Sequence, residues 1–346
     1  MIVKQAREAA RRWVDEERHK IPGFHGAYFA GSANWLPDDA ELSASSDLDV
    51  VVVLAGPNPP PKPGKLIYQD VLLEVSYFSR ERLKSPEAVL SDYHLAGGFR
   101  TPSVIADPSG ELTRLQAAVS EGYAERRWVR QRCAHARDNA LRFLRSLDEA
   151  APLHDQVNAW VFGAGVTTHV LLVAGLKNPT VRKRYLATRA LLTEYGRLDF
   201  YEPLLDLLGC VQLSSGQVEQ NLAPLTEAFD AAAALVRSPV PFASDISVGA
   251  RPIAIDGSRE LIARGLYREG IFWIVVTYTR CRTVFALDAP AETQERFEPG
   301  YRQLLGDLGI RSFEDLRRRC DDVLAFLPRV WEVAEEIMAA NPGIKE

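Results

Sequence analysis

The pattern of apolar and polar residues changes near residue 110. Before that point, short runs rich in β-branched and aromatic residues are bounded by Gly, Pro and Asp, which predicts strands over 25–30, 48–54 and 71–78. Segment 56–64 contains five prolines and is therefore expected to be an exposed loop. This part of the chain alternates strands with turns.

Two further strands complete the predicted sheet. Residues 65–68, the polar pair Gln69-Asp70 and the run from Val71 onward have the pattern of a β-hairpin with a tight turn. Residues 103–106 predict a short edge strand, which the sequence Asp107-Pro108-Ser109-Gly110 would end in a turn.

After residue 110 the apolar positions recur with the period of an α-helix, and Gly or Pro separates most of the periodic segments. The predicted helices are 111–120, 123–148, 155–174, 180–195, 214–236, 258–267, 269–287 and 313–340. We therefore expect an α+β protein with a mixed sheet and flanking helices over 1–120, followed by an all-helical C-terminal domain over 121–346.

The composition is that of a globular protein. The chain has 346 residues, 47% of them hydrophobic, with 41 Lys and Arg against 46 Asp and Glu and a net charge of −5. This excludes a disordered chain and a small disulfide scaffold, and it disfavours an extended nucleic acid or an anionic membrane as partner. An anionic ligand would have to meet a local cluster of positive charge.

The cysteines and the absence of a signal sequence indicate a cytoplasmic protein. The four cysteines are widely separated and form no CxxC pair, which is typical of reduced core thiols. Residues 1–20 are too polar for a secretory signal. The most apolar stretch, 159–176, is interrupted by His169 and glycines and is better explained as a buried helix than as a membrane span.

Three acidic residues accompany the predicted strands. Asp47 and Asp49 stand two residues apart at the start of the 48–54 strand, so both side chains should point to one face while Leu48 and Val50 point to the other. Two neighbouring carboxylates are unfavourable unless a cation lies between them. Glu74 is the only charged residue in the 71–78 run, and adjacent strands would bring all three carboxylates to a site suited to Mg²⁺.

A phosphate-binding turn is expected beside this site. Gly31 and Ser32 follow the 25–30 strand, where glycine allows close approach of the backbone and serine offers an N–H and a hydroxyl. Nucleotide phosphates would complete the coordination of the metal.

This arrangement resembles the DNA polymerase β-type nucleotidyltransferase superfamily, whose signature is Gly-Ser, a spacer, Asp-x-Asp and a later acidic residue. The segments Ser46-Asp47-Leu48-Asp49 and Leu73-Glu74-Val75 look closest to the aminoglycoside nucleotidyltransferases of the streptomycin/spectinomycin and kanamycin types. The likeness covers about residues 26–112. It departs from the family in the spacer 33–46, which is slightly longer than usual and carries an acidic segment.

The resemblance implies a two-Mg²⁺ enzyme that uses ATP or another NTP. Asp47, Asp49 and Glu74 would be the catalytic and metal-binding residues, with Glu74 a metal ligand, the general base, or both. Gly31, Ser32 and Ser46 would bind the nucleotide. An active site between the two domains is expected, and Asp38, Asp39 and Glu41 in the spacer would suit a polycationic acceptor.

The densest basic segment is the candidate for the triphosphate. Pro179-Thr180 predicts a helix start that places Arg182 and Lys183 in the first turn, where cations are unfavourable without an anion nearby. Related enzymes use a lysine of the C-terminal domain, so Lys177, Lys183 and then Arg182 are the candidates for this role. A solvated basic surface is the competing explanation.

The predicted activity is transfer of a nucleotide monophosphate, AMP in the first instance, to a hydroxyl of an aminoglycoside-like small molecule. Two alternatives remain: a protein or tRNA acceptor, or a nucleotide-binding protein that has lost turnover. The sequence does not determine the acceptor, the preferred nucleotide or the oligomeric state.

Overall fold

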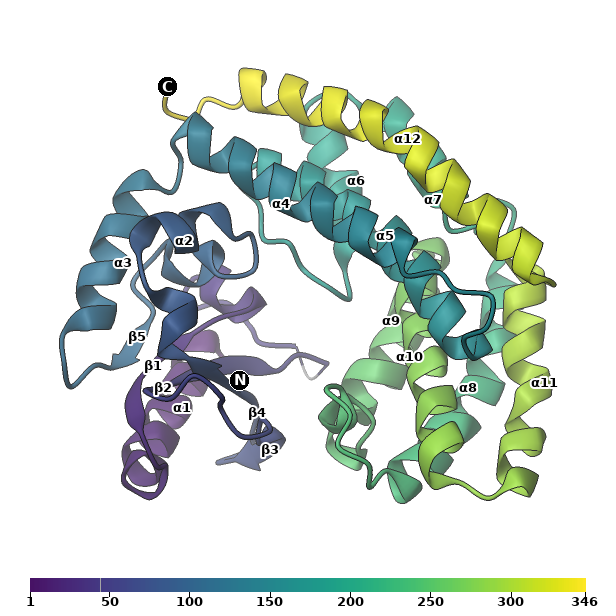
Figure 1. The fold of residues 1–346 in the computed structure, drawn as a ribbon, viewed down its shortest axis with the longest axis horizontal. Coiled ribbons are helices and arrows are strands. Elements are labelled where there is room, and N and C mark those ends of the chain that lie inside the picture. The colour runs from purple at the N-terminus through teal and green to yellow at the C-terminus, as the bar shows by residue number, and fades with distance from the viewer. Residues whose placement is uncertain (44) are drawn as a thin grey trace. The chain divides into compact units, whose positions relative to one another are not determined.

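The computed structural model describes residues 1–43 and 45–346 and has an α+β fold, with one mixed sheet and many helices (Figure 1). The predicted α+β class is therefore confirmed. The chain divides into two compact units, the first made of Met1–Arg132 and Pro342–Glu346 and the second of Cys133–Asn341. The division falls inside helix α4 (Arg126–Arg145).

The sheet of the first unit has five strands in the order β3-β4-β2-β1-β5. Strands β2 and β4 are parallel, and the other neighbouring pairs are antiparallel. All predicted strands are confirmed, including the edge position of β5 and the β3–β4 hairpin, in which Gln69 and Asp70 both have positive φ. The bounds are β1 Phe24–Phe29, β2 Leu48–Leu54, β3 Gly64–Tyr68, β4 Val71–Ser79 and β5 Val104–Ala106.

Helix α1 (Val3–Glu17) covers one face of this sheet. Its buried residues Ala6, Ala10 and Trp13 pack with Val50 of β2 and neighbouring strand residues in one apolar cluster. This helix was not predicted, although its buried residues recur with the i, i+3, i+4 spacing of an amphipathic helix.

The opposite face is covered by helices α2 (Pro86–Ser91) and α3 (Glu111–Gly122), with the short turns 80–83 and 96–99 between strands and helices. Their apolar side chains cluster with Val51 and Val53, in the second half of β2. Toward the start of β2, the positions on this same face are occupied by acidic residues instead of valines. These are Asp47, just before the strand, and Asp49.

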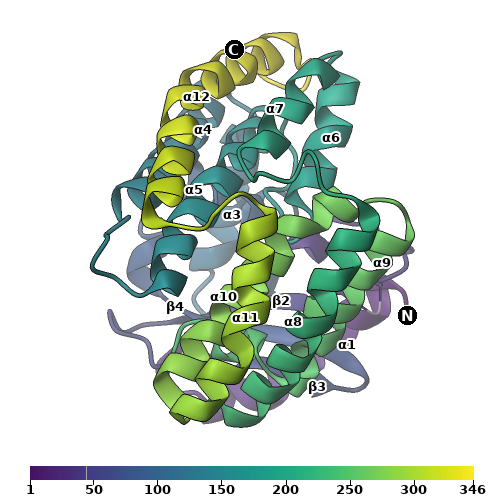
Figure 2. The same cartoon turned by 90° about the vertical axis from the view of Figure 1, so that its right-hand side faces the viewer.

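Every regular element of the second unit is a helix, and α8 (Ser215–Leu235), α10 (Tyr267–Asp288) and α11 (Ala291–Asp307) pack side by side (Figure 2). Two of its helices were not predicted, α7 and α11, the latter with Pro299 in its interior. The helix expected over 123–148 is shorter, as α4, and the helix expected from Thr180 begins only at Arg184. The remaining bounds are α5 Leu153–Ala174, α6 Arg184–Glu194, α7 Tyr201–Asp206, α9 Gly257–Ala263 and α12 Phe313–Ala340.

Among the described residues, two helices are long and apolar enough to cross a membrane by length and composition, α5 and α10. Within the protein, 89% and 72% of their most apolar windows are buried. Core helices of soluble proteins have the same character, so both are consistent with a soluble protein. His169, on α5, is buried as expected, and its Nε2 lies 3.0 Å from the carbonyl oxygen of Thr180.

Candidate metal site

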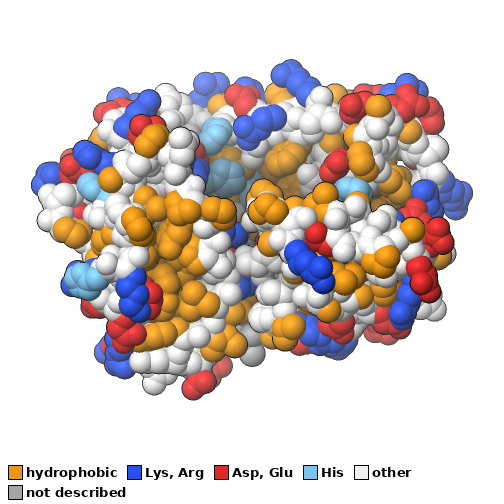
Figure 3. All heavy atoms as spheres, turned by 60° about the horizontal axis from the view of Figure 1, so that its bottom comes forward, with side chains coloured by type: hydrophobic (Ala, Val, Ile, Leu, Met, Phe, Trp, Pro, Cys, Tyr) orange, Lys and Arg blue, Asp and Glu red, His pale blue; other side chains and the backbone are white. Residues whose placement is uncertain are grey.

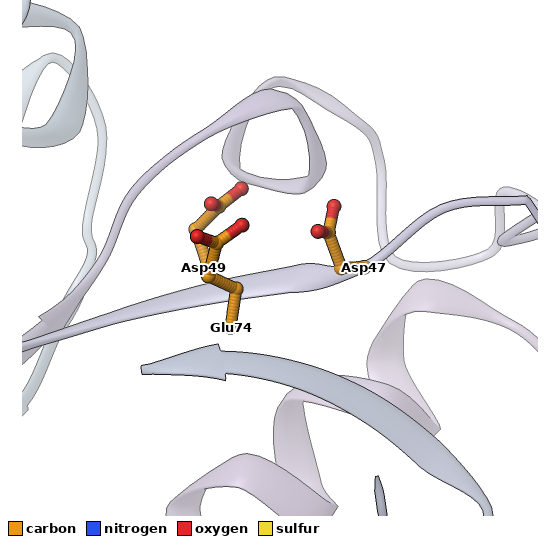
Figure 4. Close-up of side chains that lie close together, drawn as sticks. All are labelled: Asp47, Asp49 and Glu74. Atoms are coloured by element: carbon orange, nitrogen blue, oxygen red, sulfur yellow. The ribbon is translucent and has the colours of Figure 1, made fainter. Parts of the chain in front are cut away.

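The two central parallel strands bring the three predicted carboxylates together. In the β2–β4 register Asp49 lies directly opposite Glu74, and Asp47 stands two residues before Asp49 on the same face. Leu48 and Val50 point to the opposite face, into the cluster beneath α1, as predicted. Figure 4 shows the three carboxylates on the same side of β2.

The spacing of these carboxylates fits a metal ion. One oxygen of each of Asp47, Asp49 and Glu74 lies within 4.8 Å of the other two. Carboxylate oxygens are the ligands preferred by hard divalent cations such as Mg²⁺. Both the chemistry and the convergence of this donor set are therefore suitable for the predicted metal.

Two lysines that were not predicted contact these carboxylates. The Nζ of Lys65, on β3, lies 2.5 Å from an oxygen of Glu74 and 3.0 Å from an oxygen of Asp47. The Nζ of Lys62 lies 2.5 Å from the other oxygen of Glu74. The same oxygen set therefore already accommodates a positive charge between Asp47 and Glu74.

The sequence did contain a signal for Lys65. A hairpin with the two-residue turn Gln69-Asp70 pairs Tyr68 with Val71, and counting back along the strands places Lys65 opposite Glu74. Lys62 had no comparable signal, because it belongs to the proline-rich loop before β3, which has no predictable register.

The protonation of the three acids reflects their different neighbours. Burial, then the charges of Asp47 and Glu74, raise the pKa of Asp49 well above its usual value. Burial also raises the pKa of Asp47, against the charge of Lys65. Burial opposes ionisation of Glu74 as well, but the charges of Lys65 and Lys62 outweigh it together and lower the pKa of Glu74 to about 2.

Gly31 lies against Asp49. A Cβ atom at Gly31 would stand 1.6 Å from the Oδ2 of Asp49, and the φ of Gly31 is +63°. The N–H of Ala30 donates to the carbonyl oxygen of Asp49 at 3.0 Å, which ties the end of β1 to the start of β2. Gly31 and Ser32, which follow β1, are both exposed.

Ser46 directly precedes Asp47 and is partly buried, and its N–H donates to the carbonyl oxygen of Ser43. Gly31 thus lies against Asp49, Ser32 follows it in the chain, and Ser46 is adjacent to Asp47. Their contact with a nucleotide stays a prediction.

The acidic segment of the spacer is anchored to helix α1. The N–H groups of Val3 and Lys4 donate to the carbonyl oxygens of Ala40 and Asp38, and the Arg7 guanidinium pairs with the Asp38 carboxylate at 2.5 Å. Asp38 is therefore a neutralised charge, whereas no ion pair is described for the exposed Asp39 and Glu41.

The basic segment lies in the second unit, where its local structure corrects one expectation. Arg182 and Lys183 do not occupy the first helical turn, because α6 begins at Arg184 and Lys183 is its N-cap residue. Lys183 and Arg182 therefore stand at the helix N-terminus and just before it, rather than inside the first turn. Lys177 forms an ion pair with Glu194 at 2.9 Å. A role for Lys177, Arg182 and Lys183 with the triphosphate stays a prediction.

The four cysteine thiols lie in the interior. Cys133, Cys210, Cys281 and Cys320 are all buried and form no disulfide with one another. Burial raises the pKa of Cys210 and of Cys320 to about 12, so neither supplies a thiolate nucleophile at neutral pH.

Comparison of the sequence with protein-family models and with curated proteins found no match to either.

Proposed function

We propose that the protein is a Mg²⁺-dependent nucleotidyltransferase that moves a nucleotide monophosphate from an NTP, ATP in the first instance, to a hydroxyl of a small molecule. The observation that carries this proposal is the convergence of Asp47, Asp49 and Glu74 on one face of two parallel strands. The turn at Gly31, packed against Asp49, supports the nucleotidyltransferase fold that the sequence resemblance implies.

Each carboxylate has a place in such a reaction. Asp47 and Asp49 would hold Mg²⁺, and Glu74 would be a further ligand, a base, or both. The bound metal would neutralise the triphosphate and polarise the α-phosphorus. The hydroxyl oxygen of the acceptor would form a bond to the α-phosphorus as its proton passes to solvent or to a carboxylate of the site. The bond from this phosphorus to the α,β-bridging oxygen would break, and pyrophosphate would leave with the electron pair.

The residues of the chain fix the geometry and the charge for this step. Glu74 is held by two ammonium groups, so its carboxylate is ionised at neutral pH, and its low pKa makes it a weak base that is better suited to holding a cation. Gly31 leaves space above Asp49 where a side chain would otherwise stand. A phosphate group is able to approach the backbone closely at such a position.

A small acceptor in the cytoplasm agrees best with the charge and the thiols. The net charge is −5, and acidic and basic side chains are interspersed on the face shown in Figure 3. A nucleic-acid acceptor would favour a continuous basic stripe. The buried free cysteines suit a reducing compartment.

The test is pyrophosphate release from each NTP with Mg²⁺ across a panel of hydroxyl acceptors, including aminoglycosides. We expect the wild-type protein to turn over with at least one acceptor. Asp49→Asn should reduce turnover by about three orders of magnitude, which is the scale of a lost electrostatic contact to the transition state. Glu74→Gln should do the same.

Glu81→Gln is the matched control, because it removes one carboxylate from an exposed position in the same unit. It should retain wild-type turnover. Full turnover by Asp49→Asn would overturn the assignment of the metal site, and binding of Mg-ATP without turnover on any acceptor would favour the nucleotide-binding protein instead.

A further inference from the structure

We propose that Lys65 is a built-in competitor for metal at the acidic site. In this proposal its ammonium group bridges Asp47 and Glu74 in the metal-free protein and leaves Asp47 when a divalent cation binds there. The inference rests on the metal site of the proposed function and adds a control of metal affinity to it.

The contacts of Lys65 are those of a cation held in a metal site. Its side chain is 4% exposed, and its Nζ lies within ion-pair distance of two of the three candidate ligands. An ammonium group in so enclosed a position has exchanged hydration for these carboxylates. A metal ion that takes the same oxygens has to displace this charge.

Lys62 differs from Lys65 in the number of candidate metal ligands that it contacts. Among the described ion pairs Lys62 contacts only Glu74, and its side chain is 27% exposed. Lys62 therefore neutralises Glu74 alone and does not bridge two carboxylates. Lys62 and Lys65 therefore form a natural pair of variants with the same change of charge but a different relation to the metal.

The backbone prevents Lys65 from moving away with its strand. Lys65 pairs with Glu74 in the β3–β4 register, and Glu74 pairs with Asp49 across β4 and β2. Only the flexible side chain is able to release Asp47. With two ammonium groups beside three carboxylic groups, the metal-free site carries at most one net negative charge. We therefore expect weak binding of free metal and stronger binding of the metal that arrives with nucleotide phosphates.

The test measures binding of Mn²⁺ alone, by the loss of its free EPR signal, to metal-stripped full-length protein at mildly alkaline pH. Lys65→Gln should raise the affinity about tenfold or more, because a unit charge a few ångströms from the ligands has been removed. Lys62→Gln should raise it less. Lys20→Gln removes an exposed charge that pairs with Glu17 and should leave the affinity unchanged.

The outcomes separate this inference from the proposed function. Equal or weaker Mn²⁺ binding by Lys65→Gln, while the wild type binds, overturns the competitor role and leaves the proposed activity standing. Binding by Lys65→Gln alone supports the competitor role in its strongest form. If neither binds, the inference is wrong, and pyrophosphate release decides the activity independently.

A fold defect in the variant would also be informative. Without Lys65 the three carboxylates repel one another, so Lys65→Gln is expected to melt at a lower temperature than the wild type in EDTA. If the variant is unfolded without metal, recovery of its circular dichroism is titrated with Mg²⁺. Recovery of the folded signal at a Mg²⁺ concentration lower than the one at which the wild type binds Mg²⁺ supports the proposal. Absence of recovery contradicts it.

Discussion

Gly31 is the residue at which the backbone and the acidic cluster constrain each other most closely. Its φ of +63° disfavours other residues, and a Cβ atom would collide with the carboxylate of Asp49. From the sequence pattern we predicted that this glycine allows a phosphate to approach the backbone. The structure adds that the same glycine is needed to accommodate Asp49 itself.

We expect Gly31→Ala to lower the free energy of unfolding by about 1–3 kcal/mol, the range for a residue forced into a strained conformation. It should also abolish the stabilisation by metal, because Asp49 has to move away from the new methyl group. Urea unfolding with and without Mg²⁺ measures both effects.

Gly56→Ala is the control for this substitution, since a Cβ atom there would meet nothing within 4 Å. Its effect should stay within about 0.5 kcal/mol. A Gly31→Ala protein with wild-type stability and an unchanged response to Mg²⁺ would show that Asp49 does not need its described position.

At the scale of elements, the turn between β5 and α3 shows how one side chain fixes the start of a helix. The carboxylate of Asp107 accepts hydrogen bonds from the N–H and the hydroxyl of Thr113, both at 2.8 Å. Burial opposes ionisation of Asp107, but the hydrogen bonds from Thr113, Leu112 and Ser109 outweigh it and lower its pKa.

Asp107→Ala should lower the free energy of unfolding at neutral pH by about 1 kcal/mol, as for the loss of a helix cap. The pKa of Asp107 is lower in the folded protein, so its stabilisation is complete above the unfolded pKa of about 4 and disappears as the pH falls through the folded value. The difference between wild type and variant should therefore shrink in acid.

The control for Asp107 is Glu121→Ala, which removes an exposed carboxylate near the end of the same helix. Its effect should be within about 0.5 kcal/mol. A stability difference for Asp107→Ala that grows toward low pH would contradict the predicted loss of this interaction in acid.

Strands were predicted more accurately than helices, for physical reasons. The β-branched run of β2 and the two-residue turn before β4 are local signals that the sheet does not alter. Helix α11 contains Pro299, which locally disfavours a helix, but it packs against α8. The predicted start of α6 at Thr180 was also wrong, because the helix begins at Arg184.

For the whole molecule, metal binding should appear as a change in global stability, because a ligand that binds only the folded state stabilises it. Saturating Mg²⁺ should raise the melting temperature of the metal-stripped wild type. Asp49→Asn should lose this response. It should nevertheless be at least as stable as the wild type in EDTA, because it removes a buried charge that Asp47 and Glu74 repel.

Differential scanning calorimetry with EDTA or Mg²⁺ measures this pair of effects, and Glu81→Gln should respond to Mg²⁺ like the wild type. An Asp49→Asn protein that is still stabilised by Mg²⁺ would place the metal elsewhere. A marked loss of stability without metal would mean that Asp49 supports the fold rather than a ligand.

The sequence by itself determined the strands, the α+β class and the identity of the three acids, since each depends on residue type and short-range periodicity. Only the tertiary structure decided that β2 and β4 are parallel neighbours in register, because strand pairing joins segments far apart in the chain. It also decided the charge balance of the site. The hairpin register places Lys65 opposite Glu74, but the contact of Lys65 with Asp47 and the approach of Lys62 from the preceding loop depend on distances that no local pattern encodes.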